Sequence, residues 1–198
     1  MDNIANQATL LYNNMTTNSN TVTTQILSLY DLTATKEALL DTYTPNQTIT
    51  YVTRVENTGS ASLYNLTVVD DLAKGLTQYI DNSVEGYLNG TPIEVNVQIT
   101  NNTVIFTIDN VINPNDNVLI IFETTTPTTR PDVLTNTQTI TANGGSTTGP
   151  IVAVTPNPSA TVTLANYVSL DITKSANKAS IYSLSLIHIS EPTRQEAI

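Results

Sequence analysis

The chain has 198 residues and is acidic, with 17 Asp and Glu against 7 Lys and Arg and a net charge of −10. This balance argues against a nucleic-acid partner, because phosphate backbones bind basic faces. The absence of cysteine excludes a disulfide framework and thiolate chemistry. No apolar run approaches the ~18 residues of a transmembrane helix, and the N-terminal residues show no signal peptide.

Frequent Thr, Val, Ile and Tyr favour strands, and Asn, Pro and Gly supply the turns between them. Many segments alternate polar and apolar residues with period two, as half-buried strands do. In chain order, the predicted strands are Gln7–Tyr12, Thr21–Leu29, Leu32–Lys36, Gln47–Asn57, Leu63–Leu72, Val84–Ile99, Thr103–Ile108, Asn117–Thr125, Val133–Ala142, Ile151–Val154, Ala160–Leu164 and Val168–Lys174. Asn89–Gly90 is the strongest hairpin signal. This pattern predicts an all-β sandwich of two sheets.

Part of the sequence occurs twice. Leu32–Tyr43 matches Leu170–Tyr182, and upstream of these copies Asn6–Leu27 resembles Asn136–Leu164. Such self-similarity predicts one complete repeat flanked by partial repeats in a tandem array. The expected units are closing strands of a preceding or capping unit at 1–31, a complete repeat at 32–165, the first strand of a second repeat at 166–183, and a tail at 184–198.

The segment Ala34–Leu76, "ATKEALLDTYTPNQTITYVTRVENTGSASLYNLTVVDDLAKGL", resembles the bacterial surface repeat called the conserved repeat domain, or Domain of Unknown Function 11. The order of its "TK" strand, "NTG" turn and "DDLAKGL" segment carries the resemblance, which extends to about Leu164. "DDLAKGL" and "NPNDN" depart mildly from the family pattern. The resemblance implies an immunoglobulin-like sandwich in long arrays on Gram-positive cell surfaces. It implies no catalytic activity, and a fold alone never does.

Three polar residues share strand parity with apolar neighbours and are therefore expected to face inward: Lys36, Asp70 and Asn136. In the second copy, Lys174 takes the place of Lys36. One interpretation is a Lys36–Asp70 ion pair at the rim of the sandwich, with Asn136 bound to backbone and the lysine stem reaching solvent. The other is a self-formed isopeptide bond between Lys36 and Asn136, as found in similar surface sandwich domains.

The second interpretation requires that the three residues meet in the core, and the first stays open beside it. Burial disfavours an ammonium and frees the lysine amine as a nucleophile. A buried carboxyl group polarises the amide and shuttles protons. The order Lys, Asp, Asn along the chain resembles one such class of domains. Like a disulfide, the bond would close a loop of about 100 residues and constrain the unfolded chain.

No other set of residues points to catalysis or to a cofactor. The sequence has no phosphate-binding loop, no GxSxG and no HExxH. "NPNDN" and "VVDDL" offer oxygen atoms without the spacing of a calcium loop, so no metal site is predicted. We expect a non-catalytic stalk or adhesion module, on a bacterial surface or secreted, whose partners are neighbouring repeats and a host or matrix ligand. The alternative is a module that binds glycan or host protein through its end loops.

The C-terminal residues do not continue the repeat. Leu184–Arg194, "LSLIHISEPTR", resembles the translation of a transposon-type sequencing adapter. We therefore expect the tail from about Ser183 to be non-native and not to be part of the fold. The only histidine, His188, lies in this tail and is not a site candidate.

Overall fold

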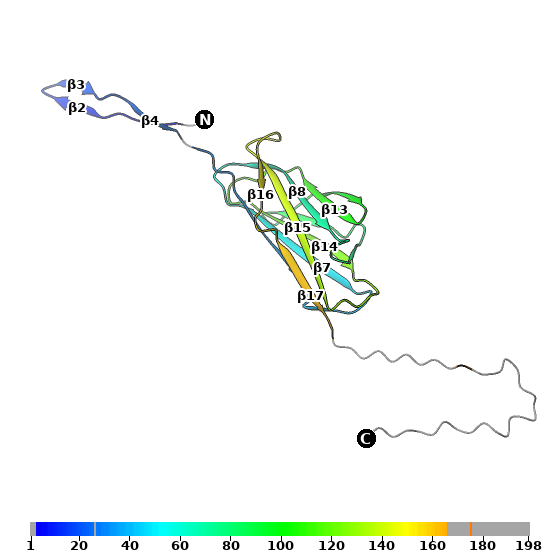
Figure 1. The fold of residues 1–198 in the computed structure, drawn as a ribbon. Coiled ribbons are helices and arrows are strands. Elements are labelled where there is room, and N and C mark those ends of the chain that lie inside the picture. Colours follow the sequence, from blue (N-terminus) through cyan, green and yellow to red (C-terminus); the bar gives the residue numbers. More distant parts are fainter. Residues whose placement is uncertain (1–2, 26, 166–174, 176–198) are drawn as a thin grey trace, which may run out of the picture. The chain divides into compact units, whose positions relative to one another are not determined.

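The computed structural model describes residues 3–25, 27–165 and 175. These residues contain strands and no helix (Figure 1). Accordingly, no helix in the described part of the chain is long and apolar enough to cross a membrane. The predicted strand Val168–Lys174 and the tail from residue 184, with His188, lie outside the described residues.

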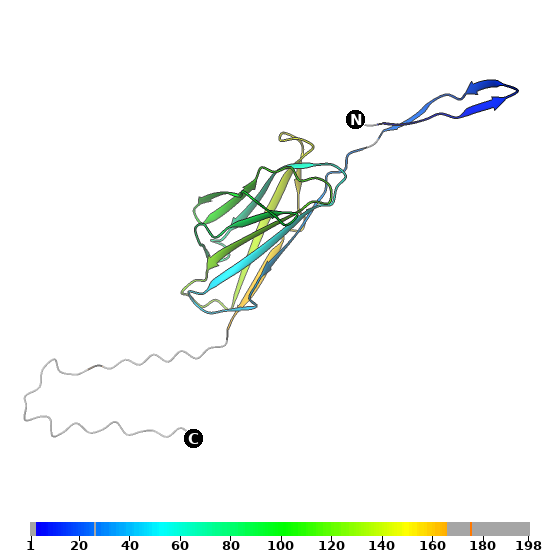
Figure 2. The ribbon, with the colours of Figure 1, turned by 180° about the vertical axis from the view of Figure 1, so that it is seen from behind.

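Residues 32–164 form an immunoglobulin-like β-sandwich, which confirms the predicted fold class (Figures 1 and 2). One sheet has the order β11-β10-β14-β7-β5, with β9 paired to β14. Its strands are β5 (Leu32–Ala38), β7 (Thr48–Asn57), β9 (Gln78–Tyr79), β10 (Glu85–Leu88), β11 (Thr91–Ile93) and β14 (Asn117–Thr125).

The other sheet has the order β12-β13-β8-β15-β17-β6, with β16 paired to β15. Its strands are β6 (Thr42–Tyr43), β8 (Leu63–Asp71), β12 (Asn96–Thr100), β13 (Thr103–Ile108), β15 (Val133–Gly144), β16 (Ile151–Ala153) and β17 (Ser159–Leu164). Pairs within both sheets are antiparallel, apart from the short parallel contact of β17 with β6. Val84–Ile99 was predicted as one strand, but the structure divides it. The hairpin of β10 and β11 belongs to the first sheet, and β12 belongs to the second.

The core lies between the two sheets because alternate residues of the long strands point inward. Strands β7, β14 and β15 alternate buried with half-buried or exposed residues along their length. Three rings fill the centre: Phe106 and Phe122 have centroids 5.0 Å apart, and Tyr51 stacks on Phe122 at 5.6 Å. Aromatic pairs at these distances add to the free energy gained by burial.

Asparagine makes the tight turns. The predicted hairpin at Asn89–Gly90 is confirmed, with φ of 51° and 80°. Asn101 and Asn102 join β12 to β13 with φ of 50° and 62°. Two positive φ values in a two-residue loop match the twist of the flanking strands, and asparagine tolerates this conformation better than most residues.

Residues 3–25 form a separate two-stranded arrangement, here called the N-terminal ribbon. Its strands are β1 (Asn3–Asn6), β2 (Thr9–Tyr12), β3 (Met15–Asn18) and β4 (Val22–Gln25). β1 pairs with β4 and β2 with β3, and every residue of the ribbon is exposed. The predicted strand Thr21–Leu29 is longer than the observed β4, because Leu27–Leu29 has no strand partner.

Candidate functional site: a buried Lys36 cluster

The three inward-facing residues predicted from strand parity meet in the core. Lys36 lies on β5, at the edge of one sheet, whereas Asp70 and Asn136 lie on the adjacent strands β8 and β15 of the other. Each shares its strand face with a buried apolar residue (Leu32, Val68 and Leu134, respectively), so the backbone aims each polar side chain between the sheets. Lys174, the predicted counterpart in the second repeat, lies outside the described residues.

One oxygen atom of Asp70 holds the site together. Lys36 Nζ donates to Asp70 Oδ2 at 2.7 Å, and Asn136 Nδ2 donates to the same atom at 3.3 Å. The side chains of Lys36 and Asp70 are both 0% exposed. The ion pair is therefore not at the rim, and Asn136 binds Asp70 rather than backbone, in contrast to the first interpretation of the sequence.

Sequence reasoning missed a fourth member of the site. Gln138 Nε2 donates to Asp70 Oδ2 at 2.9 Å, and Thr53 Oγ1 donates to Gln138 Oε1 at 2.7 Å. Gln138 pairs with Asp70 across the β15–β8 ladder, and Thr53 pairs with Lys36 across the β7–β5 ladder. Gln138 has the same strand parity as Asn136, so the rule that found Asn136 also indicates Gln138. We call Lys36, Asp70, Asn136 and Gln138 the Lys36 cluster.

Aromatic rings surround the lysine. The Lys36 ammonium lies 4.9 Å from the ring centroid of Tyr51 and 5.4 Å from that of Phe122. Burial lowers the pKa of Lys36 to about 8, against the opposing attraction of Asp70. Burial also raises the pKa of Tyr51 to about 12, and the negative charge of Asp70 adds to this rise. A larger share of Lys36 is therefore neutral near physiological pH than of an ordinary surface lysine.

Two oxygen atoms of the cluster have no hydrogen-bond donor. Asp70 Oδ1 and Asn136 Oδ1 are buried and accept no hydrogen bond from the described residues. Buried polar atoms without partners are uncommon in native proteins and costly. The Asn136 carboxamide therefore donates a hydrogen bond through Nδ2 but accepts none through Oδ1.

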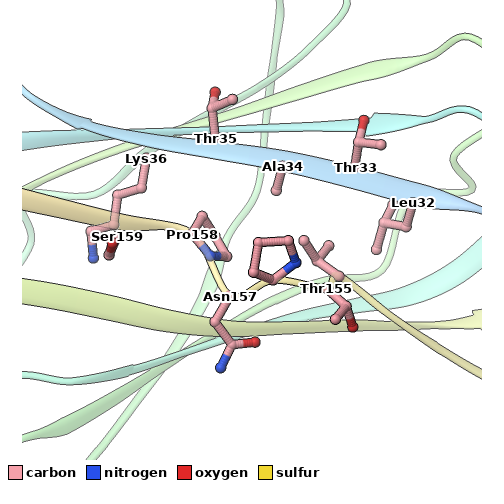
Figure 3. Close-up of a pocket in the computed structure, with 11 residues that line it drawn as sticks. Leu32, Thr33, Ala34, Thr35, Lys36, Thr155, Asn157, Pro158 and Ser159 are labelled. Atoms are coloured by element: carbon pink, nitrogen blue, oxygen red, sulfur yellow. The ribbon is translucent and has the colours of Figure 1, made fainter.

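A surface groove of about 420 Å³ runs along β5 next to the cluster (Figure 3). It is bounded by β5 and by the segment from Val154 to Ser159 that leads into β17. In Figure 3 the side chains of Leu32, Ala34 and Lys36 point to the groove side of β5, whereas Thr33 and Thr35 point away. The groove lies between the two sheets, where the edge strand β5 of one sheet runs beside β17 of the other.

The described residues contain no group of three or more His, Asp or Glu that could hold a metal ion. In "NPNDN", the Asp116 carboxylate accepts hydrogen bonds from the Asn89 side chain and the Asn113 backbone, so it closes the turn. The Lys36 cluster instead brings together a buried lysine amine, a carboxylate that accepts its hydrogen bond, and a carboxamide. These are the components of acyl transfer to an amine.

Comparison with family models gave no match, and comparison with curated proteins gave none either. Solved structures do match. The major pilin subunit BcpA of Bacillus cereus is 13% identical, with a TM-score of 0.53, over 80% of this chain and 47% of that one. Domains D2 and D3 of the major pilin SpaD of Corynebacterium diphtheriae are 16% identical, with a TM-score of 0.52, over 65% of this chain and 51% of that one.

The chain thus spans about half the length of each of these pilin structures. At such low identity the likeness establishes the fold alone. The chain is therefore an immunoglobulin-like sandwich similar to domains of Gram-positive pilins.

Proposed function

We propose that this chain is a non-catalytic structural module of a bacterial surface protein, and that an isopeptide bond between Lys36 and Asn136 fastens its sandwich. The observation that carries the proposal is the shared contact of Lys36 Nζ and Asn136 Nδ2 with Asp70 Oδ2. The resemblance of Ala34–Leu76 to the conserved repeat domain and the likeness to pilin folds both support a place in a tandem array on the cell surface.

The proposed reaction needs no group beyond the cluster. Asp70 takes a proton from the Lys36 ammonium, and the neutral Nζ attacks Cγ of Asn136. The Cγ–Nδ2 bond breaks, and Nδ2 takes up a second lysine proton through Asp70, so it leaves as ammonia. Of the three ammonium protons, one stays on the new amide, one leaves with ammonia and one remains on Asp70. The contact of one carboxylate oxygen with both nitrogen atoms supports this transfer.

The bond would suit a load-bearing stalk. It would join β5, the edge strand of one sheet, to β15, a central strand of the other. A loop of about 100 residues would then be closed covalently, which limits the unfolded chain as a disulfide does. Among the described residues β5 has one strand partner, β7, and without the bond its contacts with the other sheet are non-covalent.

Intact mass tests the crosslink. The measured mass of the purified chain is expected to be lower, by one ammonia, than the mass calculated from its sequence. For Lys36→Met, the measured mass should equal the mass calculated from the variant's sequence. Lys74→Met is the matched control, because Lys74 is an exposed lysine whose ion pair with Asp71 is on the surface. An unmodified chain that loses no ammonia contradicts the crosslink.

A binding screen tests the structural role against the alternative of ligand capture by end loops. The unit Leu32–Leu164 is applied to a glycan array and to immobilised matrix proteins. A stalk module should retain none of them, whereas specific retention would establish a ligand-binding module.

A further inference from the structure

The N-terminal ribbon repeats the pairing of the last three strands of the sandwich, which we call the closing strands (β15, β16 and β17). The pairs Asn3↔Gln25 through Asn6↔Val22 run in the same order as Val133↔Thr163 through Asn136↔Ala160.

The correspondence continues beyond a short break. Five residues after Asn6, Leu11 pairs with Thr16, and five residues after Asn136, Thr141 pairs with Ala153. In the ribbon, β2 pairs with the nearer strand β3 and β1 with the farther strand β4. In the sandwich, the end of β15 likewise pairs with the nearer strand β16 and its start with the farther strand β17. This correspondence places Asn6 at the position of Asn136.

The ribbon also repeats the inward face of the closing strands. Residues Leu134, Ile140 and Ala142 are buried in the sandwich, and the ribbon has Ile4, Leu10 and Tyr12 at these positions. These three side chains are 59%, 63% and 67% exposed. The ribbon thus has apolar side chains at the positions that form the core of the sandwich, but these side chains are exposed.

A two-stranded ribbon with one apolar face is marginal in water without further strands. In the sandwich, β8 pairs with β15 along its edge, and β5 of the opposite sheet lies beside β17. Opening strands of the same unit thus extend this sheet and pack against its inward face. The sandwich of residues 32–164 cannot also cover the ribbon, since its own closing strands occupy that place. Its Ala142 is buried at 1% exposure, where the ribbon carries the much larger Tyr12.

We propose that the N-terminal ribbon closes a second sandwich of the same kind, and that Asn6 is the acceptor of an isopeptide bond there. The partner is a set of opening strands like those of residues 32–132, with an inward lysine on its first strand and an inward aspartate on the counterpart of β8. The lysine amine would attack Cγ of Asn6 and release ammonia, with the same proton balance as at Asn136. The covalent part rests on the proposed function, whereas the docking does not.

The test adds a set of opening strands ahead of the ribbon. A tandem variant carries an added copy of residues 27–132 ahead of Met1 of the full chain, so that opening strands directly precede the ribbon. Its second sandwich is the intact one and serves as an internal control. Tyr12→Ala in the same variant gives the ribbon the residue that the sandwich has at the corresponding position, Ala142. This substitution removes any steric conflict that the larger tyrosine would cause in the added core.

Two readouts separate docking from crosslinking. Amide hydrogen exchange around Leu10 should slow by at least a hundredfold relative to the full chain, and the mass should fall by two ammonia molecules rather than one. Asn6→Ala should remove one loss and Asn136→Ala the other. If the ribbon amides exchange rapidly in the tandem variant, and also in the tandem variant with Tyr12→Ala, the proposal is overturned.

The remaining outcomes are equally decisive. A protected ribbon with ammonia lost only at Asn136 overturns the assignment of Asn6. A protected ribbon with no ammonia lost at either site supports docking and refutes the proposed function instead.

Discussion

The N-terminal ribbon and the closing strands share one pairing pattern and differ in burial. Asn6↔Val22 and Asn136↔Ala160 are corresponding pairs, yet Asn136 is 1% exposed and every residue of the ribbon is exposed. The register of a hairpin is set by its turn and its local sequence. Burial depends on strands more distant in the chain.

Local sequence is enough to pair two strands, whereas a site also needs side chains from strands that are distant in the chain. In the closing strands, Asn136 becomes part of a cluster only because β8 and β5 bring Asp70 and Lys36 to it. Asn6 has the same strand position and lacks such partners among the described residues. Substitutions at corresponding positions should therefore differ sharply in effect, and four predictions measure this difference.

The largest difference is expected at the two asparagines. Asn136→Ala prevents the proposed bond and should lower the free energy of unfolding by about 4–5 kcal/mol, the loop-closure contribution for about 100 residues. Asn6→Ala on the exposed ribbon should change it by less than about 0.5 kcal/mol. Guanidinium denaturation of both variants measures the difference, and equal midpoints would contradict a stabilising role for Asn136.

The corresponding apolar positions come next. Ile140→Ala removes a fully buried side chain and should cost about 2–5 kcal/mol, because a cavity is left in the core. Leu10→Ala removes a side chain that is 63% exposed and should cost less than about 0.5 kcal/mol. Thermal unfolding of the two variants checks this pair. A large loss for Leu10→Ala would mean that the ribbon is already covered in the full chain.

A smaller difference is expected at Gln138 and its ribbon counterpart, Ala8. Gln138→Leu removes one donor from Asp70 and leaves the Thr53 hydroxyl unpaired, which should cost about 1–3 kcal/mol. Ala8→Leu should be nearly neutral, since position 8 is exposed. If Gln138 also positions Asp70 for proton transfer, Gln138→Leu should slow ammonia loss. An unchanged rate, followed by intact mass of newly synthesised chain sampled over time, would limit Gln138 to a structural role.

The pH dependence should be the mildest effect. In Asn136→Ala, Lys36 stays a free amine whose folded-state pKa of about 8 lies below its ordinary 10.5. Between these values the unfolded chain binds more protons, so stability should rise with pH through this window. Lys36→Met in the Asn136→Ala background should abolish the rise. The ribbon contains no Lys, Arg, His, Asp or Glu and should not contribute.

Strand parity was sufficient to find most of the site. It placed Lys36, Asp70 and Asn136 on inward faces, and the structure brings them to one oxygen atom. Gln138 has the same parity as Asn136 and was detectable by the same rule. Tyr51 and Thr53 were not, since buried tyrosine and threonine are ordinary core residues of a strand.

Other features depend on contacts that a local pattern does not contain. The two-residue strands β6 and β9 exist through pairing with β17 and β14, far away in the chain. The Asn101–Asn102 turn is less distinctive in an asparagine-rich sequence than Asn89–Gly90, although both adopt positive φ. The strand order of each sheet is likewise set by non-local packing.

The most direct test of the central claim is a tryptic peptide map of the denatured chain. An isopeptide bond blocks cleavage after Lys36 and joins the peptide that carries Lys36 to the peptide that carries Asn136. We predict a single branched species lighter by one ammonia than the sum of its parts. Complete recovery of both linear peptides, with cleavage after Lys36, would contradict the account.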